Sequence, residues 1–193
     1  KYALFHPDGG MLWAQRAVAA IAGLAQRKGA KVRAQTRIVA VLKDKKHGIT
    51  GVKDAAGKVY EGESYLFAAG AWTKDILKEY GLPLTVTRQE ALYLRPPQNQ
   101  GRYRPQHFPV MSVTQRGFHM MPVHIHGFLK VGMHKQGKKV TNVLPPSPDA
   151  KFVAKVRSFL KAHIADLAGF QDFEGKVYYY TRTPDGDFIL DKL

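Results

Sequence analysis

The stretch Gly127–His134 (GFLKVGMH) decides how we interpret the fold of this 193-residue chain. Its pattern predicts a short β-strand, whose successive side chains point to opposite faces of a sheet. Lys130 and Gly132 then share one face with an aromatic ring and an imidazole, while the other face is apolar. Glycine leaves room there for a large flat group or for another backbone. The alternative is that Lys130 is an exposed lysine on the wet face of an antiparallel sheet.

Length and composition indicate a globular protein that can bury a sizeable core. The chain has 193 residues, of which 45% are hydrophobic. It has no apolar run of about 18 residues, so we expect no membrane span, and no signal peptide is visible. It does not begin with methionine and it stops directly after a strand-like run. We therefore expect an internal fragment, whose partner is the remainder of the same polypeptide.

The formal net charge of +15, from 30 basic and 15 acidic side chains, raises the question of a nucleic-acid partner. The basic residues are spread along the chain, apart from short clusters at Lys43–Lys46 and Lys135–Lys139. No nucleic-acid motif is recognisable, so we interpret the charge as a solvated basic surface and expect no nucleic-acid partner. The absence of cysteine excludes disulfides and favours a reducing compartment, and we expect a cytoplasmic location.

Hydrophobic periodicity predicts a helix, a β-meander and a buried strand in the first part of the chain. The helix covers Met11–Lys28, follows a capping turn at Asp8–Gly10, and has an alanine-rich face suited to packing on a sheet. Tyr65–Ala69 is a continuous apolar run, as expected for a strand buried on both faces of a parallel sheet. Thr73 is placed to cap a short helix that ends at Gly81. The meander consists of Arg37–Lys43, a turn at Lys45–Gly48, Ile49–Lys53 and Lys58–Glu61.

Composition shifts at Gly81–Pro83, which we predict to be a domain boundary. Beyond it, the patterns predict an amphipathic helix over Phe152–Leu167 and antiparallel strands joined by turns and loops. The loop Arg95–His107 is long enough to be functional, and its arginines 95, 102 and 104 could attract a substrate carboxylate. A second polar loop covers Lys135–Pro148. The predicted strands are Leu84–Leu94, Val110–Val113, Phe118–Pro122, Phe128–His134, Lys176–Thr181 and Phe188–Leu190.

The histidines pose the question of a metal site. His124 and His126 would share a face if they lay on a strand, and His119 and His134 fall on neighbouring strands. No acidic residue nearby could orient these imidazoles, and Pro122–Gly127 has the pattern of a hairpin turn. We therefore expect no metal, and the absence of a nucleophile elbow gives no support to hydrolase chemistry.

The C-terminal stretch Lys176–Asp191 (KVYYYTRTPDGDFILD) resembles a signature of the FAD-dependent amine oxidases. Three further segments match this family in order: Gly9–Gly10 with the helix after it, Ala69–Trp72, and Gly127–His134. Within the D-amino-acid-oxidase-like group, the chain is most similar to the branch of monomeric sarcosine oxidase and N-methyltryptophan oxidase. The four segments together span nearly the whole chain, which makes the match fairly specific.

The resemblance implies an α+β fold that forms the central part of a two-domain FAD-dependent oxidoreductase. Residues 1–82 would be the middle of the FAD-binding domain, an α/β remnant with the helix, the meander and the returning strand. Residues 83–193 would be most of the substrate-binding domain and the start of the return to the FAD domain. That second part is expected to be a mixed, largely antiparallel sheet with helices on one side.

The resemblance also implies roles for individual residues. Lys130 matches the lysine beside the flavin ring that promotes reaction with O2, because a fixed ammonium stabilises the anion that develops. His134 matches a histidine near the flavin, Tyr180 an active-site tyrosine, and His119 an aromatic residue lining the substrate cavity. A buried core tyrosine is the alternative for Tyr180. The expected FAD-binding residues are Val41, Ala69, Gly70, Trp72 and Tyr178.

Two departures from the family pattern stand out. Tyr178 occupies the position of a cysteine that attaches FAD covalently in this branch, so we expect non-covalent binding of FAD. The Gly-x-Gly-x-x-Gly fingerprint and the glycine-rich segment that closes over the flavin are both absent from this sequence. We therefore expect that this fragment alone neither binds FAD tightly nor turns over substrate.

The resulting expectation is a fragment of an enzyme that oxidises the C–N bond of a small secondary or N-methyl amino acid. Its electrons would pass through FAD to O2 and give H2O2. Two alternatives stay open: an FAD-dependent dehydrogenase that uses another electron acceptor, and a non-catalytic basic binding domain.

Overall fold

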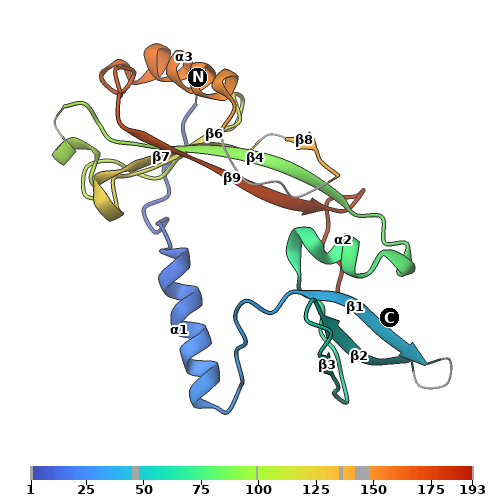
Figure 1. Cartoon of the computed structure of the whole chain (residues 1–193). Helices are drawn as coiled ribbons and strands as arrows, with labels where there is room; N and C mark the ends of the chain where they lie inside the picture. Colours follow the sequence, from blue (N-terminus) through green and yellow to red (C-terminus); the bar gives the residue numbers. More distant parts are fainter. Residues whose placement is uncertain (1, 45–47, 99, 135–136, 142–147, 193) are drawn as a thin grey trace. The chain divides into compact units, whose positions relative to one another are not determined.

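The computed structural model describes residues 2–44, 48–98, 100–134, 137–141 and 148–192. The chain forms two compact units (Figure 1). The first unit comprises Lys1–Met11 and Val86–Tyr180, and the second comprises Leu12–Thr85 and Thr181–Leu193. The expected assignment of the two parts of the chain to an FAD domain and a substrate domain stays a prediction.

The first unit is built on a six-stranded sheet with one long helix on one of its faces (Figure 1). The strand order is β5-β6-β7-β4-β8, and β9 pairs with β4. The backbone N–H of Arg95, after β4, donates to the carbonyl of Asp172, before β9, so the end of one strand meets the start of the other. The strands are β4 (Thr85–Leu94), β5 (Met111–Val113), β6 (Phe118–Met121), β7 (Leu129–Met133), β8 (Lys138–Lys139) and β9 (Phe173–Arg182).

Helix α3 (Ala150–His163) is the predicted amphipathic helix, and it continues into a short 3-10 helix at Ala165–Leu167. Its first turn is stabilised by Asp149, whose carboxylate accepts a hydrogen bond from the backbone N–H of Lys151 at 2.9 Å. Two more 3-10 helices, at Gln100–Tyr103 and Ile125–Gly127, belong to the connections of this sheet.

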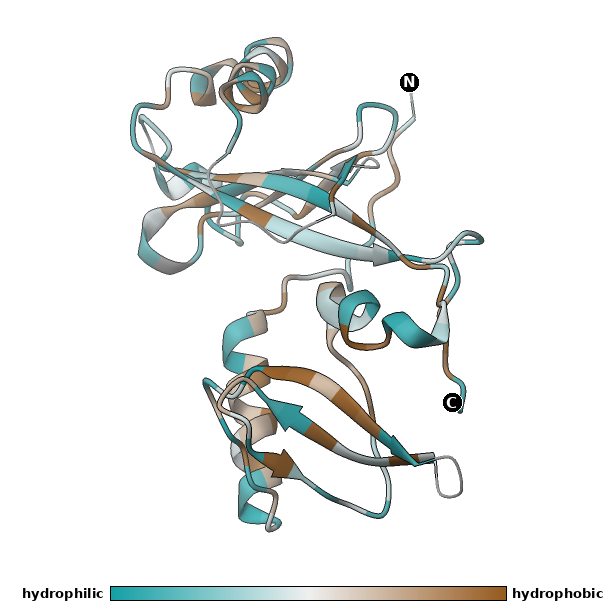
Figure 2. Cartoon of the chain, turned by 45° about the vertical axis from the view of Figure 1, so that its right-hand side comes forward, coloured by the Kyte–Doolittle hydropathy of each residue, from teal (hydrophilic) through white to brown (hydrophobic). Residues whose placement is uncertain are grey.

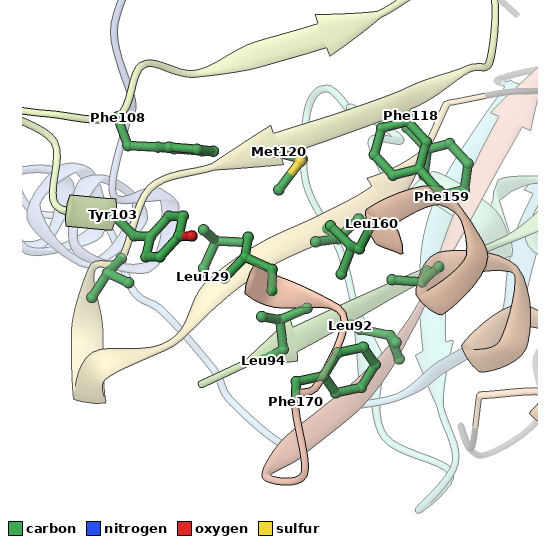
Figure 3. Packing of buried hydrophobic residues seen from close by; sticks show 14 of the residues in the cluster. Leu92, Leu94, Tyr103, Phe108, Phe118, Met120, Leu129, Phe159, Leu160 and Phe170 are labelled. Atoms are coloured by element: carbon green, nitrogen blue, oxygen red, sulfur yellow. The ribbon is translucent and has the colours of Figure 1, made fainter. Parts of the chain in front are cut away.

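The hydrophobic core lies between α3 and the sheet (Figure 3). Leu129 and Val131 of β7 are fully buried there, which confirms the predicted apolar face of the strand. The rings of Phe118 and Phe159 stack with their centroids 4.1 Å apart. The other buried members of this cluster are Leu92, Leu94, Tyr103, Phe108, Met120, Val123, Phe152, Val156, Leu160, Leu167 and Phe170.

The second unit contains the predicted helix and the predicted meander. The meander forms a sheet of order β1-β2-β3, and β1 is hydrophobic over most of its length (Figure 2). The turn between β2 and β3 is held by Asp54, whose carboxylate accepts from the N–H groups of Ala56 and Lys58 and from the hydroxyl of Tyr60, each at 2.9 Å. The elements are α1 (Ala14–Arg27), β1 (Ile38–Asp44), β2 (Gly48–Asp54), β3 (Val59–Tyr60), α2 (Thr73–Ile76) and 3-10 helices at Gly70–Trp72 and Lys78–Tyr80.

Two predicted strands are wrong. Tyr65–Ala69 is irregular, and Leu66 in its middle is 88% exposed. A strand needs backbone partners, whereas this segment is attached to β2 through the Tyr65 hydroxyl, which donates to the carbonyl of Thr50 at 2.8 Å. Phe188–Leu190 is likewise irregular and exposed. Both segments are apolar, but an apolar segment becomes a strand only if a neighbouring sheet edge offers its backbone groups for pairing.

The predicted helix caps are also wrong. Helix α1 follows Trp13 and α2 follows Trp72, and neither start has a side-chain cap, so Asp8 and Thr73 do not act as predicted. The expected packing of α1 on a sheet is not seen, because this helix buries none of its residues within the described part of the chain. The end of the short helical segment at Gly81 is confirmed, and its φ of 61° explains the choice of glycine.

Some expectations concern residues that the structure does not describe. Residues 45–47 of the predicted turn Lys45–Gly48, and most of the loop Lys135–Pro148, lie outside the described residues. Among the helices that are described, none has the length and apolarity required to cross a membrane.

Candidate functional site

The candidate site is the face of the first unit's sheet that points away from α3. Since Leu129 and Val131 enter the core, the alternation along β7 places Lys130 and Gly132 on the opposite face. Directly paired residues of antiparallel strands share a face. The register therefore adds four neighbours to this face, with Tyr93 and Met121 opposite Lys130, and Ala91 and His119 opposite Gly132.

Lys130 is half-buried among aromatic rings. Its Nζ lies 4.9 Å from the ring centroid of Tyr178 on β9 and 5.9 Å from that of Tyr93 on β4. Both distances fall in the range of cation–π attraction. Among the residues that the structure describes, Lys130 makes no ion pair with a carboxylate. Its positive charge therefore lies next to two rings and, among the described residues, has no carboxylate to neutralise it.

The two tyrosines beside Lys130 are joined to each other. Their hydroxyl oxygens are 2.7 Å apart, and either one can be the donor. Burial raises the pKa of Tyr178 well above its ordinary value, and the hydrogen bond with Tyr93 raises it further. A second lysine, Lys176 on β9, places its Nζ 4.8 Å from the ring centroid of Tyr93 and 4.0 Å from the Glu174 carboxylate.

The space beside Gly132 is filled by the imidazole of His119. A Cβ at Gly132 would lie 2.5 Å from Cε1 and 2.6 Å from Nε2 of that ring. The flat group beside this glycine is therefore the chain's own histidine. The expectation that Gly132 leaves space for an external group is wrong. Burial lowers the pKa of His119 below its ordinary value, and the charges of Lys130 and His134 lower it further. The His119 imidazole, next to Lys130, is therefore uncharged at neutral pH.

Tyr180 and His134 form a second pair at the edge of the same face. The hydroxyl of Tyr180 is 3.3 Å from Nδ1 of His134, and their ring centroids are 5.7 Å apart. The imidazole of His134 in turn meets that of His119 edge to face, with centroids 6.3 Å apart. Tyr180 is half-buried and lies outside the hydrophobic core, so the alternative of a core tyrosine is wrong. The four residues expected to be catalytic thus come from one sheet: His119 from β6, Lys130 from β7, His134 directly after β7, and Tyr180 from β9.

The remaining candidates for FAD binding belong to the second unit. Ala69, Gly70 and Trp72 lie together at the 3-10 turn before α2, whereas Val41 is in the middle of β1, paired with Val52. Gly70 has a φ of 54°, and among the described residues no atom beyond its two chain neighbours lies within 4 Å of the position that its Cβ would take. Trp72 is 53% exposed. An open glycine backbone beside an exposed indole fits a group that approaches the main chain and stacks on a ring.

Two other expectations concern charged and metal-ligating side chains. Arg95 and Arg102 are each paired with a carboxylate, of Asp172 at 2.8 Å and Asp166 at 2.9 Å, so these two guanidiniums are not free to receive a substrate.

His124 and His126 lie around the 3-10 turn Ile125–Gly127 and not on a strand. The described residues contain no group of three or more histidine, aspartate or glutamate side chains that could hold a metal ion.

Sequence reasoning missed Tyr93 and Lys176. Tyr93 falls at the end of a correctly predicted strand, but its role depends on the register that sets it opposite Lys130. Ala91 and Tyr93 alternate with two buried leucines, and this pattern could have shown that the two residues share the face opposite the core. It could not have shown which strand pairs with them. Lys176 stands at the start of the predicted C-terminal strand, and it meets Tyr93 because β9 pairs with β4.

Solved structures share this arrangement of strands and helices. Fructosyl amine:oxygen oxidoreductase (amadoriase I) from Aspergillus fumigatus matches with a TM-score of 0.76 at 20% identity, over 93% of this chain and 44% of that chain. L-proline dehydrogenase from P. horikoshii matches with a TM-score of 0.73 at 21% identity, over 93% and 46%. At this identity the likeness shows the fold alone. The fold class is α+β, as expected.

The family follows from the sequence comparison. The model of the family described as DAO, FAD dependent oxidoreductase, matches residues 1–193. The chain therefore belongs to this family, whose cofactor is FAD.

Curated relatives match nearly the whole of this chain at low identity. Monomeric sarcosine oxidase of Bacillus sp. (strain NS-129) is 26% identical over 202 residues, which are 98% of this chain and 49% of the relative. N-methyl-L-tryptophan oxidase of Yersinia pestis (strain Pestoides F) is 27% identical over 203 residues, 99% of this chain and 50% of the relative. The chain spans about half the length of these curated relatives.

Proposed function

We propose that the full-length protein oxidises the C–N bond of a small secondary or N-methyl amino acid and passes the electrons to O2, giving H2O2. The proposal is supported by membership in the FAD-dependent oxidoreductase family and by similarity to a sarcosine oxidase and an N-methyl-L-tryptophan oxidase. FAD, when bound, supplies the two-electron chemistry that neither lysine, histidine nor tyrosine can provide.

The residues of this chain would contribute binding and electrostatics. In the second unit, Ala69, Gly70, Trp72 and Val41 are the proposed contacts to FAD. In the first unit, Tyr178 is the proposed contact. This chain has no cysteine, so none of its residues can form a thioether with FAD.

The observation that carries the proposal is the Lys130 ammonium, half-buried between two aromatic rings with no carboxylate partner among the described residues. Electron transfer to O2 develops negative charge, and a fixed ammonium in a partly dry site lowers the energy of that charge more than water would. Burial and the charge of the nearby Lys130 lower the pKa of the neighbouring His119. This imidazole would therefore stay neutral and leave Lys130 as the positive charge beside the developing anion.

Tyr180 and His134 are the proposed substrate-side pair. Their hydroxyl and imidazole nitrogen, 3.3 Å apart, can hold or exchange a proton at the edge of the site. We assign them to orienting the amine and its carboxylate, and His119 to lining the same cavity.

The test uses the full-length protein with the substitution Lys130→Met. Stopped-flow absorbance separates reduction of the enzyme by sarcosine under nitrogen from its reoxidation by O2. We expect reoxidation to slow by about 100-fold or more, as for loss of a preorganised charge at a developing anion, with reduction by sarcosine much less affected. The matched control is Lys161→Met, an exposed lysine on α3, the helix on the other face of the sheet.

Three results would contradict the proposal. Unaltered reoxidation in Lys130→Met removes this lysine from its role. Rapid reduction by the amino acid, without H2O2 in air but with turnover on a dye acceptor, identifies a dehydrogenase. A purified protein that is yellow but unreactive with every N-methyl amino acid, or that carries no flavin, favours the non-catalytic basic binding domain.

A further inference from the structure

Tyr93 and Tyr178 are 85 residues apart in the sequence, yet their hydroxyl oxygens lie 2.7 Å from each other across the β4–β9 pair. Each phenolic O–H can donate or accept, and a hydrogen bond at its tip restricts where the side chain can lie. Both tyrosines are half-buried. Burial raises the pKa of Tyr178, so its hydroxyl stays protonated at neutral pH and can take part in this hydrogen bond.

The two rings meet the ammonium of Lys130 from two neighbouring strands. Tyr178 approaches from β9 at 4.9 Å, and Tyr93 from β4 at 5.9 Å. Lysine has four flexible methylenes, so an unrestrained ammonium would lose considerable rotamer freedom on taking a single position. Rings that are already ordered lower that loss, and their negative faces attract the cation.

Lys176 influences which of the two rings the Lys130 ammonium approaches more closely. Its Nζ lies 4.8 Å from the Tyr93 ring, closer than the 5.9 Å of Lys130. Two like charges cannot both be drawn to one ring without repelling each other. The Lys176 ammonium also lies 4.0 Å from the Glu174 carboxylate, which offsets part of this repulsion, and Lys130 makes its shorter contact with Tyr178.

We propose that Tyr93 and Tyr178, which we call the tyrosine clamp, are positioning residues that hold the Lys130 ammonium in the place where it acts. The inference rests on the proposed function, because it assigns the clamp to the same reaction with O2. Neither tyrosine exchanges a proton or an electron in this role. The clamp acts through the position of Lys130.

The first test is kinetic and uses the full-length protein with Tyr178→Leu, Tyr178→Phe and Tyr93→Phe. Loss of one ring in Tyr178→Leu is expected to slow reoxidation by O2 by about 5- to 30-fold, as for one partly desolvated cation–π contact. Reduction by sarcosine should slow by a clearly smaller factor than reoxidation, although Tyr178 is also a proposed contact to FAD. The two phenylalanine variants keep both rings and lose the hydroxyl pair, so they should fall between Tyr178→Leu and the wild type.

The matched control is Tyr179→Phe, the same loss of a hydroxyl one residue along β9, on the opposite face of the strand. It should leave both half-reactions unchanged. An equal slowing of reduction and reoxidation in Tyr178→Leu, or an effect of Tyr179→Phe as large as that of Tyr178→Phe, would mean general damage to the strand and would overturn the clamp.

The second test reads the position of Lys130 without turnover. Reductive methylation with ¹³C-formaldehyde labels lysines and retains their charge, and Lys130→Met identifies the Lys130 signal by its disappearance. Ring currents of the two tyrosines should shift this signal upfield of the other lysines in the wild type. The shift should shrink in Tyr93→Phe and Tyr178→Phe, and most strongly in Tyr178→Leu.

The two tests separate the clamp from the proposed function. If Lys130→Met slows reoxidation but Tyr178→Leu alters neither the reoxidation rate nor the Lys130 signal, the clamp is wrong and the proposed function stands. If Lys130→Met leaves reoxidation unchanged, the proposed function is wrong, and with it the catalytic role of the clamp. In that case an upfield Lys130 signal would still support the contact geometry.

Discussion

Replacing Gly132 by alanine tests the packing at the centre of the candidate site. The new methyl group would lie 2.5 Å from Cε1 and 2.6 Å from Nε2 of His119, and 3.4 Å from Cβ of Ala91. Real carbon contacts are longer than 3 Å, so the imidazole must move. The backbone does not oppose the change, because Gly132 is outside the left-handed region, and alanine is favoured over glycine in a strand by about 0.5–1 kcal/mol.

The expected cost follows from these two opposing effects. Overpacking of a buried position costs about 1–3 kcal/mol, and the backbone preference offsets part of it. Gly132→Ala should therefore lower the free energy of unfolding of the full-length protein by about 1–2 kcal/mol. Equilibrium urea unfolding followed by far-UV circular dichroism measures this change, with an unchanged m-value expected.

A double-mutant cycle identifies the cause. In the His119→Ala background the ring is gone, so Gly132→Ala should be neutral or stabilising by about 0.5–1 kcal/mol. Gly23→Ala in α1 is the control, because its Cβ would meet no atom closer than Nη1 of Arg27 at 3.7 Å and it should stabilise the helix. If Gly132→Ala is equally costly with and without His119, the ring does not fill this space and the geometry of the site is wrong.

The remaining predictions concern pH and a buried hydroxyl. Burial and the charges of Lys130 and His134 lower the pKa of His119, so the unfolded state takes up this proton first and stability falls as the pH drops below about 6.5. In thermal melts between pH 8 and 5, the melting temperature should fall less in His119→Gln than in the wild type. An equal fall in the two proteins would mean that His119 is not the group responsible. Burial and a 2.8 Å hydrogen bond to Asp166 raise the pKa of Tyr103 to about 12. Tyr103→Phe removes this hydrogen bond and should cost about 1–2 kcal/mol in urea unfolding, whereas unchanged stability would mean that water replaces it without loss.

Local patterns in the sequence were sufficient for most elements. Alternation placed Leu129 and Val131 in the core and Lys130 on the other face of β7, and helical periodicity located α3 with its buried Phe152 and Leu160. These features depend on residues within a few positions of each other, so the sequence contains them directly. The family resemblance likewise rests on ordered local segments.

The apolar runs at Tyr65–Ala69 and Phe188–Leu190 show where local patterns fail. Each has the composition of a strand, and neither is one in this structure. A strand exists when another backbone offers its N–H and C=O groups at the right spacing. Composition shows that a segment can be a strand, and it contains no information about whether an edge is available.

The site itself was decided by the tertiary structure. The sequence by itself singled out Lys130, His119, His134 and Tyr180 as candidates, but it did not place Tyr93 opposite Lys130 or join its hydroxyl to Tyr178. Strand register depends on pairing between distant segments, and a shift by one residue would turn every side chain to the other face. Lys130 has ring partners because β4, β7 and β9 pair in one register, and no local pattern determines that.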